Sequence, residues 1–598
     1  MNILLLGSGG RECAIATALV ESPKCDRLFI APGNGGTAEL GTNVALDIED
    51  GRAVVDFARE NDCELVVIGQ EAPLVAGVAD VVRDAGIDCF GPGAAGARVE
   101  GSKDFSKRLM MKYDLPTAAY GTFTDCDSAL AYLNEQGAPI VVKADGLAAG
   151  KGVTVALTKE EADEAICECF DGRFGEAGST VVLEEMMTGP ECSMLAFTDG
   201  VTMIPMAPSQ DHKRAYENDE GPNTGGMGVY SPVPIVTDEE HATMVDIMER
   251  AVAGLREEGI DYRGVLYGGF MLTPQGPKLL EFNARFGDPE TQVVLPRLET
   301  DLVDVMVATA QRRLSEIELS WRPEWAVSVV LASEGYPGDY AKGFEITGID
   351  EANTLPGVHV YHAGTKVEDG KVYTNGGRVL NVTALGSTFE QARDRAYEAC
   401  DLIDWDGKFM RRDIGARAMR GRSERILSST RSFEGRLLKV DSVDIELPNG
   451  HRTTHEVVRH PGAVCVVALD DQGRVLVVRQ YRTALERVTV EVPAGKLDPG
   501  EDPEDAVRRE LAEETGYVAG EIRRLASIAV AVGYSDEIIH LYLATDLEPG
   551  PAHPDEDEFI AAEWVGVESL IDSVLDGRIE DSKTVIAALI CDALRRRV

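Results

Sequence analysis

The chain has 598 residues, and its 58 Lys and Arg against 102 Asp and Glu give a net charge of −44 at pH 7. At roughly 150 residues per domain this length suggests about four domains. The composition, 44% apolar and 27% charged, is that of folded globular protein. An excess of negative charge repels nucleic-acid phosphates and anionic lipid, so anionic substrates need local basic or metal-bearing pockets.

The N-terminus and the cysteines favour a cytoplasmic protein. The opening MNILLLGSGG lacks the basic region and cleavage site of a signal peptide. No uncharged apolar run reaches the roughly eighteen residues of a membrane span. Eleven cysteines without a CxxC pair indicate reduced thiols, with no disulfides or structural zinc.

The pattern of apolar residues along the chain predicts its division into domains. Strand-like residues 2–7 and 64–69 flank a helical stretch, which predicts a parallel, doubly wound sheet. Apolar runs at 463–469 and 474–480 flank a turn and predict a hairpin. Residues 419–431 are rich in Arg, Gly, Ser and Thr and have no apolar periodicity, so they are predicted to form a linker. The expected parts are 1–102, 103–322, 323–418, the linker 419–431, and 432–598.

A glycine-rich turn, GSGGRE, follows the first strand and opens a helix. There the N–H groups of Gly9 and Gly10 and the charge of Arg11 can approach a phosphate, although a plain tight turn has the same pattern. Glu12 replaces the third glycine of GxGxxG, so a nicotinamide cofactor is not expected.

A second glycine loop, GLAAGKG, contains Lys151. It has three residues between its glycines where a Walker A loop has four, and Gly follows the lysine in place of Ser or Thr. A flexible loop that closes over a triphosphate fits this pattern better.

The segment KLLEFNARFGD collects oxygen ligands and a guanidinium. In a strand, Glu281, Asn283 and Arg285 point to one face, while Leu280 and Phe282 point to the other. This arrangement suits Mg²⁺ bridging nucleotide phosphates, with arginine neutralising a transferring phosphoryl group. The alternative is a solvated strand face with a charge pair.

Nine segments taken in order resemble one enzyme family. They are GGRE (9–12), APGN (31–34), EAPL (71–74), GSK (101–103), KADGLAAGKG (143–152), SQDHKR (209–214), PNTGGMGVYSP (222–232), EFNARFGDPE (281–290) and RRDIG (411–415). Together they resemble the glycinamide ribonucleotide synthetases, or phosphoribosylamine–glycine ligases, over residues 1–418. The resemblance implies a Rossmann-like domain, an ATP-grasp domain, a small C-terminal domain, and ATP-dependent ligation of glycine to 5-phosphoribosylamine.

The resemblance also implies roles for single residues. Those implied to bind ATP are Lys103, Lys143, Lys151, the adenine hinge Glu184, Glu185 and Met186, and Glu191 at the ribose. Those implied to bind Mg²⁺ are Glu281 and Asn283, and Asp211, Lys213 and Arg285 are implied to lie near glycine and the acyl phosphate. The implied contacts of phosphoribosylamine are Gly9, Gly10, Arg11, Asn34 and Arg378.

Two positions depart from the family pattern. Cys13 stands where the family usually reads GGREHA, and Gln70 where it reads GPEAPL. A thiol cannot reproduce the hydrogen bonds of imidazole, so we expect Cys13 to be a packing position. The implied mechanism has glycine attack the γ-phosphate and the amine attack glycyl phosphate, without a covalent enzyme nucleophile.

A second motif, GX5EX7REUXEEXGU, fits residues 495–517 at every defined position and resembles the Nudix box. Asp502 and a following proline can begin its helix, and Gly516 can end it. Glu510, Glu513 and Glu514 share one helical face and would repel one another without cations between them. We expect Glu510 and Glu514 to bind metal, and Glu513 and Glu514 to serve catalysis.

Neighbouring segments, VEVPAG before the box and RQYR upstream, resemble the ADP-ribose pyrophosphatases. The resemblance implies that Arg479 and Arg482 meet the diphosphate and that the Ala494 carbonyl binds metal. Glu556, in an acidic run, is the candidate base, although such a run is commonly just a solvated loop. The usual proline beyond the box is missing, so another nucleoside diphosphate sugar is the alternative substrate.

The sequence therefore predicts a bifunctional α/β and α+β enzyme, a purine-synthesis ligase fused to a Nudix α/β/α sandwich. Its expected partners are ATP, glycine, 5-phosphoribosylamine, ADP-ribose, and Mg²⁺ or Mn²⁺ at both sites. We expect neither nucleic-acid nor membrane partners, and allow for a homodimer through the Nudix domain. The alternatives are a nucleotide-sensing C-terminal module and a different carboxylate–amine ligase.

Overall fold

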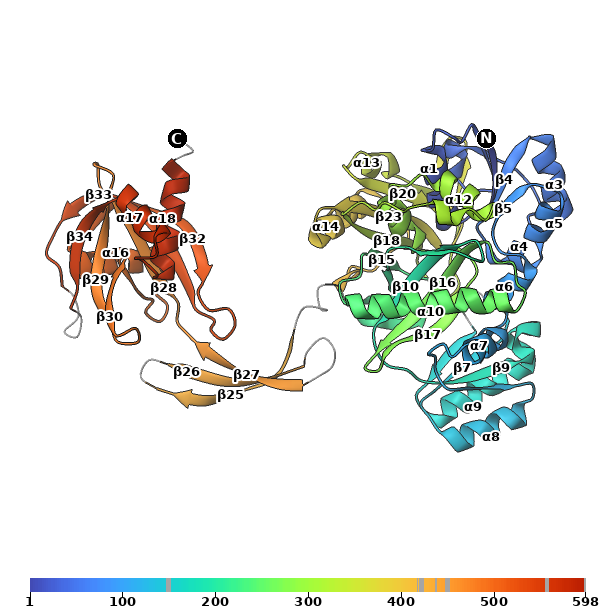
Figure 1. Cartoon of the computed structure of the whole chain (residues 1–598), viewed down its shortest axis with the longest axis horizontal. Coiled ribbons are helices and arrows are strands. Elements are labelled where there is room, and N and C mark those ends of the chain that lie inside the picture. Colours follow the sequence, from blue (N-terminus) through green and yellow to red (C-terminus); the bar gives the residue numbers. More distant parts are fainter. Residues whose placement is uncertain are drawn as a thin grey trace. The chain divides into compact units, whose positions relative to one another are not determined.

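The structure is a computed structural model that describes residues 1–146, 152–416, 418, 424–435, 438–446, 452–553 and 559–595. The chain forms two compact units, Met1–Arg422 and Ser423–Val598. In Figure 1 the first unit runs from blue to yellow and the second from orange to red. Within the described ranges, no helix is long and apolar enough to cross a membrane.

The first unit begins with a parallel sheet in the order β3-β2-β1-β4-β5. Its elements are β1 (Asn2–Gly7), α1 (Gly10–Val20), β2 (Arg27–Pro32), α2 (Thr37–Leu40), β3 (Thr42–Asn43), α3 (Gly51–Glu60), β4 (Cys63–Ile68), α4 (Glu71–Val75), α5 (Val78–Asp84), β5 (Asp88–Phe90) and α6 (Ala94–Gly101). Ile3, Leu4 and Leu5 are fully buried, as expected of a strand covered on both faces. The predicted doubly wound sheet is confirmed.

A smaller antiparallel sheet, β6-β9-β7-β8, follows α7 (Lys103–Lys112). Its elements are β6 (Tyr120–Phe123), α8 (Cys126–Gln136), β7 (Ile140–Ala144), β8 (Val153–Ala156), α9 (Lys159–Glu168), short helical turns at Cys169–Arg173 and Gly175–Ser179, and β9 (Val181–Glu185). Helices α8 and α9 pack together over this sheet (Figure 1) around a separate apolar cluster that includes Leu133, Ile140 and Ile166.

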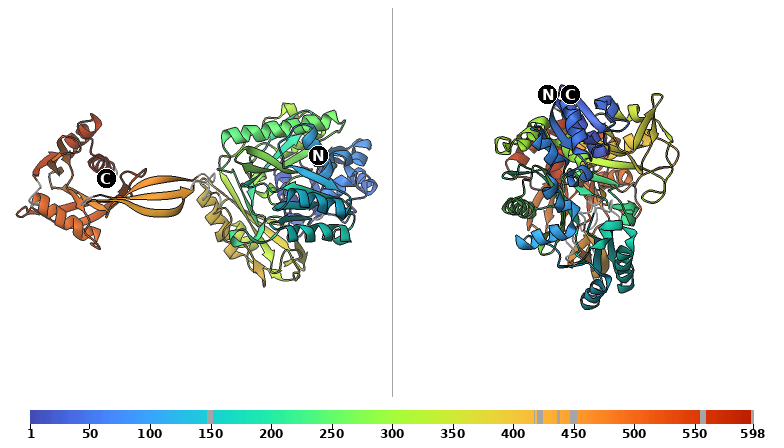
Figure 2. Two further views of the ribbon diagram at one scale, coloured as in Figure 1. Left: turned by 90° about the horizontal axis from the view of Figure 1, so that it is seen from below. Right: turned by 90° about the vertical axis from the view of Figure 1, so that its right-hand side faces the viewer.

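Two larger sheets hold the rest of the first unit. The order β11-β10-β16-β17 comprises β11 (Met203–Pro205), β10 (Glu191–Thr198), β16 (Gly264–Thr273) and β17 (Gly276–Asn283). Helix α10 (Asp238–Glu257), bright green in Figure 2, packs against it.

The other large sheet has the order β12-β15-β18-β23-β20, with β24 beside β18. Its strands are β12 (Gln210–Asp211), β15 (Gly228–Ser231), β18 (Trp325–Ser333), β23 (Arg378–Gly386), β20 (Val358–His362) and β24 (Lys408–Phe409). Because β12 and β15 join β18, one sheet crosses the predicted domain boundary at residues 322–323.

Shorter elements complete the first unit. The strands are β13 (Arg214–Tyr216), β14 (Glu220–Asn223), β19 (Glu345–Ile346), β21 (Thr365–Glu368) and β22 (Lys371–Thr374). The helices are α11 (Thr291–Val294), α12 (Leu302–Ala310), α13 (Ile349–Asn353) and α14 (Phe389–Leu402), with 3-10 turns at Glu217–Asp219, Leu295–Arg297 and Leu314–Glu316.

The second unit is an α/β/α sandwich preceded by a three-stranded sheet, β25-β26-β27. Its elements are β25 (Arg425–Glu434), β26 (Lys439–Glu446), β27 (Arg452–Arg459), β28 (Ala463–Leu469), β29 (Arg474–Arg482), β30 (Arg487–Glu491), β31 (Ala494–Lys496), α16 (Pro503–Thr515), β32 (Tyr517–Ala529), β33 (Ile538–Pro549), β34 (Ala561–Gly566), α17 (Val567–Leu575) and α18 (Ser582–Arg595). Along β28, Val464 and Val466 pack with α16, while Cys465 and Val467 pack with α17 and α18. The predicted hairpin β28–β29 forms.

Strand β25 shortens the predicted linker 419–431. Residues 425–431 belong to this strand, and residues 419–423 lie outside the described ranges. Asp441 of β26 forms ion pairs with Arg431 of β25 and Arg459 of β27, and these pairs link the three strands. Ile426 is 65% exposed and Phe433 55%, so β25 itself buries no apolar face, whereas Val443 and Ile445 of β26 are buried. Without a buried face the strand has no apolar periodicity, which is why its sequence looks like a connector.

The caps of α16 give a direct stability test. The Asp502 carboxylate accepts the Glu504 N–H at 2.8 Å, and Gly516 ends the helix with φ of 74°. Asp502→Ala should lower the free energy of unfolding of residues 423–598 by about 1 kcal/mol. Urea unfolding of the segment 423–598 can be followed by the fluorescence of Trp564, its sole tryptophan. The variant should show a lower urea midpoint with an unchanged slope of free energy against urea concentration. An unchanged midpoint would contradict the capping role.

Candidate active sites

The glycine turn after β1 is packed tightly by buried polar groups. Gly9 N–H donates to Glu12 Oε2 at 2.6 Å, and Arg11 pairs with the same carboxylate. Arg11 also donates to the Phe286 carbonyl at 3.1 Å and is 6% exposed. A Cβ on Gly10 would lie 2.7 Å from Asn381 Oδ1 of β23, so a larger residue would have to displace this buried side chain. Arg11 thus ties the turn to the segment after β17.

Asn34 and Cys13 shape the loops beside this turn. Asn34 Nδ2 donates to the carbonyls of Ser8 at 2.9 Å and His362 at 2.8 Å, and its Oδ1 accepts two backbone N–H groups. Cys13 packs against Tyr361, and burial raises the pKa of its thiol to about 12. The structure therefore places both residues in the frame of the turn.

Arg378, at the start of β23, is linked to the glycine turn through Asp288. Its Nη1 donates to the Gly225 carbonyl at 2.8 Å and the Asp288 carbonyl at 2.9 Å, while Nη2 lies 3.3 Å from the Asp288 carboxylate. That carboxylate would lie 3.4 Å from a Cβ on Gly9. Asp288 thus lies between Arg378 and the start of α1. A helix N-terminus and a guanidinium are both groups that can hold a phosphate, and we call this group of residues the phosphate cradle.

Basic side chains surround a buried carboxylate on β9. Lys107 Nζ and Lys143 Nζ each lie 2.9 Å from Glu184, whose side chain is 3% exposed. Burial alone would raise the pKa of Glu184, but the two lysines hold it below its usual range. Lys103 donates to the Gly146 carbonyl at 3.2 Å, and burial lowers its pKa while Glu281 opposes this.

The sequence reasoning missed Lys107, although a signal existed. Lys107 follows Lys103 by four residues on α7, so the two share a helical face. Glu184 points its carboxylate into this lysine cluster, whereas Glu185 is exposed at the end of β9 and Met186 follows it. Lys151 lies outside the described residues.

Strand β17 presents the expected oxygen ligands, with one correction. Glu281 and Asn283 are partly exposed and Phe282 is buried, but Leu280 is also partly exposed. A bulge leaves Leu280 unpaired opposite β16, because Gly269 pairs with Glu281 and the next residue pairs with Leu279. The extra residue shifts the alternation, and the Leu280 carbonyl accepts from Lys143 at 3.5 Å.

Arg285 lies beside the metal-type ligands on a rigid support. Its Nη2 lies 2.7 Å from Glu100, and its Nε lies 3.8 Å from Glu71. Burial would lower the pKa of Arg285, but these carboxylates raise it. The guanidinium is therefore charged and held in one orientation.

A further acidic and basic group lies where β10, β12 and β16 meet. Lys213 Nζ is 3.0 Å from Asp211 and 3.5 Å from Glu191. Burial would lower the pKa of Lys213, but Asp211 holds it well above its usual range. Ser193, Tyr267 and Glu290 form a hydrogen-bonded group beside it, which the sequence reasoning missed.

In the second unit, Arg509 holds the carboxylates of α16. Its guanidinium lies 2.9 Å from Glu501, 2.8 Å from Glu510 and 3.0 Å from Glu513. These pairs raise the pKa of Arg509 and lower that of Glu501 to about 2. Like charges on one helix face are thus separated by a cation.

Two carboxylates of α16 approach the backbone of β31. Ala494 N–H donates to Glu514 at 3.2 Å, and Glu514 is 8% exposed. A Cβ on Gly495 would lie 1.9 Å from the Glu510 carboxylate, so only glycine allows this approach. Carboxylates and backbone carbonyls are preferred ligands of Mg²⁺ and Mn²⁺. Within the described ranges no complete cage of three acidic, His or Cys side chains forms.

The two candidate arginines of β29 are not brought together. Arg479 binds Glu563 at 2.7 Å, whereas Arg482 binds the buried Glu491 through two contacts of 2.7 Å. Positions three apart on a strand point to opposite faces. Arg482 and Lys583 lower the pKa of Glu491 to about 2, against its burial. Glu556 lies outside the described residues.

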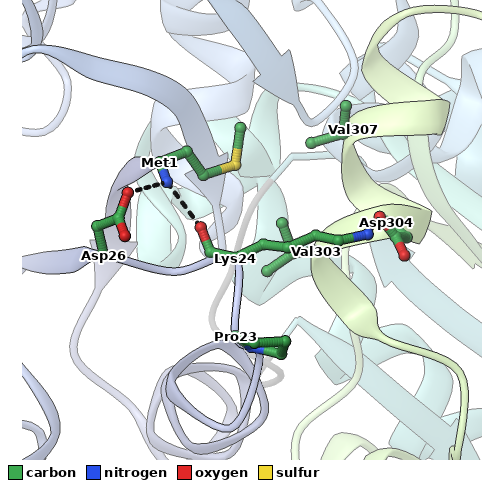
Figure 3. A pocket seen from close by; sticks show the side chains of 7 residues that line it. All are labelled: Met1, Pro23, Lys24, Asp26, Val303, Asp304 and Val307. Atoms are coloured by element: carbon green, nitrogen blue, oxygen red, sulfur yellow. Dashed lines mark hydrogen bonds and ion pairs between the residues drawn. The ribbon is translucent and has the colours of Figure 1, made fainter.

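A surface cavity of about 340 Å³ lies elsewhere in the first unit. Figure 3 shows Met1, Lys24, Asp26 and Asp304 among its lining residues, with the terminal amine bonded to Asp26 and the Lys24 carbonyl. Its lining contains none of the predicted site residues.

Comparisons with known proteins found relatives of both units. Family models match the phosphoribosylglycinamide synthetase N domain at residues 1–100, its ATP-grasp (A) domain at 101–291, its C domain at 326–417, and a NUDIX domain at 458–589. Phosphoribosylamine–glycine ligase of Mesorhizobium japonicum is 51% identical over 420 residues, which are 70% of this chain and 99% of that protein. The ligase of Pseudomonas aeruginosa is 51% identical over 424 residues, 70% of this chain and 98% of that protein.

Solved structures extend the comparison. The phosphoribosylamine–glycine ligase of Thermotoga maritima matches with TM-score 0.61 and 34% identity, covering 69% of this chain and all of that one. The biotin carboxylase domain of Hydrogenobacter thermophilus 2-oxoglutarate carboxylase shares the fold, with TM-score 0.53 and 18% identity over 68% of this chain and 91% of that one. The chain therefore belongs to the phosphoribosylamine–glycine ligase family and carries a NUDIX domain after the ligase portion.

Proposed function

We propose that the first unit ligates glycine to 5-phosphoribosylamine and converts ATP to ADP and phosphate. The convergence within one unit of a lysine cluster, a metal-type ligand pair and a phosphate cradle supports this most strongly. Lys103 and Lys143 neutralise the ATP phosphates, and Gly9, Gly10 and Arg378 receive the phosphate of phosphoribosylamine.

Glu281 and Asn283 fit a divalent cation by their chemistry. One carboxylate and one amide oxygen leave the remaining positions to phosphate oxygens and water, as Mg²⁺ prefers. A cation bound there supplies positive charge at the transferring phosphoryl group. The same ligands suit Mn²⁺.

Asp211, Lys213 and Arg285 orient glycine in this proposal. Lys213 is charged and held 3.0 Å from Asp211, so it can also attract the glycine carboxylate. Arg285 stabilises the acyl phosphate, because Glu100 and Glu71 fix its guanidinium. Glu191, which lies 3.5 Å from Lys213, and Glu184, which binds Lys107 and Lys143, support a nucleotide site here, with Glu185 and Met186 following Glu184 as the proposed adenine hinge.

We propose that the second unit hydrolyses ADP-ribose to AMP and ribose 5-phosphate. The approach of Glu510 and Glu514 to the Ala494–Gly495 backbone supports a metal-dependent diphosphatase. A divalent cation bound there would lower the pKa of an attacking water. Arg482 is our candidate for the diphosphate, and Glu556 for the base. Another nucleoside diphosphate sugar, or a sensing role without turnover, is the alternative.

Glu281→Gln tests the ligase assignment. Replacing the anionic ligand with a neutral amide should lower the ligase kcat about 100-fold or more. Glu299→Gln is the matched control, because Glu299 is exposed and bonds only to a surface serine among the contacts described. Both activities are measured on the full chain, and hydrolase turnover should not change. Near-normal ligation by Glu281→Gln would refute the metal assignment.

Glu514→Gln separates a catalyst from a sensor in the second unit. Hydrolysis of ADP-ribose, followed as AMP release with Mg²⁺ or Mn²⁺, should fall about 100-fold or more. Binding should weaken less than about tenfold, because Arg482 still meets the diphosphate.

Glu504→Gln on the exposed side of the same helix is the control and should keep full turnover. A wild-type chain that binds ADP-ribose yet hydrolyses no nucleoside diphosphate derivative would favour the sensor.

A further inference from the structure

Glu290 is a buried carboxylate held by neutral groups. It is 3% exposed and directly precedes α11. The Tyr267 hydroxyl donates to its Oε1 at 3.0 Å, and the Ser193 hydroxyl lies 3.3 Å from the same oxygen. Among the ion pairs of the described residues none includes Glu290, in contrast to Glu184 and Asp211. Burying a carboxylate without a paired cation costs stability, and such residues occur chiefly at functional sites.

The chain places Glu290 between two parts of the ligase site. Asp288, two residues earlier, binds Arg378, and Gln292, two residues later, would lie 2.8 Å from a Cβ on Gly10. Glu290 is thus flanked in sequence by the phosphate cradle.

Its hydroxyl partners belong to the other part. Tyr267 on β16 is the cross-strand neighbour of Asn283, and Ser193 lies two residues after Glu191 on β10. The carboxylate therefore connects the cradle segment to strands β10 and β16, which lie beside the strands that carry the proposed metal and glycine groups.

The surrounding charges favour a proton acceptor. Burial and then Asp211 raise the pKa of Glu290, while Lys213 lowers it. The negative charge of Glu290 also helps to raise the pKa values of Arg285 and Arg378. A carboxylate with a raised pKa accepts a proton more readily at neutral pH than a solvated one.

We propose that Glu290 binds the amine of phosphoribosylamine and accepts its proton as the amine attacks glycyl phosphate. This inference rests on the proposed ligase function. The nitrogen lone pair forms the C–N bond to the carbonyl carbon, and the C–O bond to phosphate breaks with its electrons leaving on phosphate. The proton passes from nitrogen to Glu290, and we assign it to Oε2 because Oε1 already accepts the hydroxyls.

Glu290→Gln, made in the full chain, tests this role through two reactions. The first is ligation with phosphoribosylamine formed from ribose 5-phosphate and ammonia. The second traps glycyl phosphate with a high concentration of hydroxylamine, a strong nucleophile whose proton can pass to solvent. We expect ligase kcat to fall about 100-fold or more, since a general base contributes 10²–10⁴-fold. Hydroxamate formation and the KM for glycine should stay within about threefold of wild type.

Asp199→Asn is the matched control for a purely structural effect. Asp199 is also buried, but its carboxylate accepts the N–H groups of Thr202 at 2.7 Å and Leu314 at 3.1 Å. Asp199→Asn weakens these two contacts far from the reacting groups, so it should lower ligation and hydroxamate trapping by the same factor. If Glu290→Gln does not fold, Glu290→Asp keeps the carboxylate but withdraws it, and should lower ligation at least tenfold while trapping persists.

Three outcomes would overturn the inference. They are near-normal ligation by Glu290→Gln, equal loss of ligation and trapping, and a raised KM for glycine with unchanged kcat, which would place the ammonium of glycine at Glu290. Failure of the wild-type chain to ligate would refute the proposed function, and the inference with it. Normal wild-type ligation with any of these outcomes would refute the inference alone.

Discussion

A charge buried in a protein interior needs a partner, because water no longer solvates it and an uncompensated ion costs several kcal/mol. Glu184 with Lys107 and Lys143, Glu12 with Arg11, and Glu491 with Arg482 all meet this requirement. These pairs fix basic side chains in a chain of net charge −44, where anionic substrates would otherwise be repelled. The placement of the candidate sites follows from this pairing.

The two units pair their buried charges in different ways. In the first unit, lysines from α7 and β7 share one carboxylate on β9, so their spare hydrogen-bonding capacity can turn to phosphates. In the second, Arg509 separates the glutamates of one helix and leaves Glu514 against the backbone of β31. Glu290 departs from the pattern, since hydroxyls rather than cations hold it.

Local features were predictable from the sequence. Asp502 and Gly516 bound α16, and a hairpin forms around the Asp470 turn, because caps and turns depend on a few neighbouring residues. The repeated strand–helix pattern of the first residues was enough to predict the doubly wound sheet.

Contacts distant in sequence were not predictable. The bulge at Leu280 depends on pairing with β16. The helical face of Lys107 could be read from its spacing to Lys103, but its partner Glu184 lies about eighty residues later. Strand β25 has no apolar period, because its residues 426–434 are all exposed. The opposite directions of Arg479 and Arg482 could have been read from strand alternation once β29 was assigned.

The central claim is that the pairs and ligands of the first unit assemble one ligase site. Its most direct measurement is ADP release by the full chain with each substrate omitted in turn. The account predicts that release requires both glycine and phosphoribosylamine, with one ADP formed per glycinamide ribonucleotide. Equal release with another amino acid, or with ammonia in place of phosphoribosylamine, would contradict it.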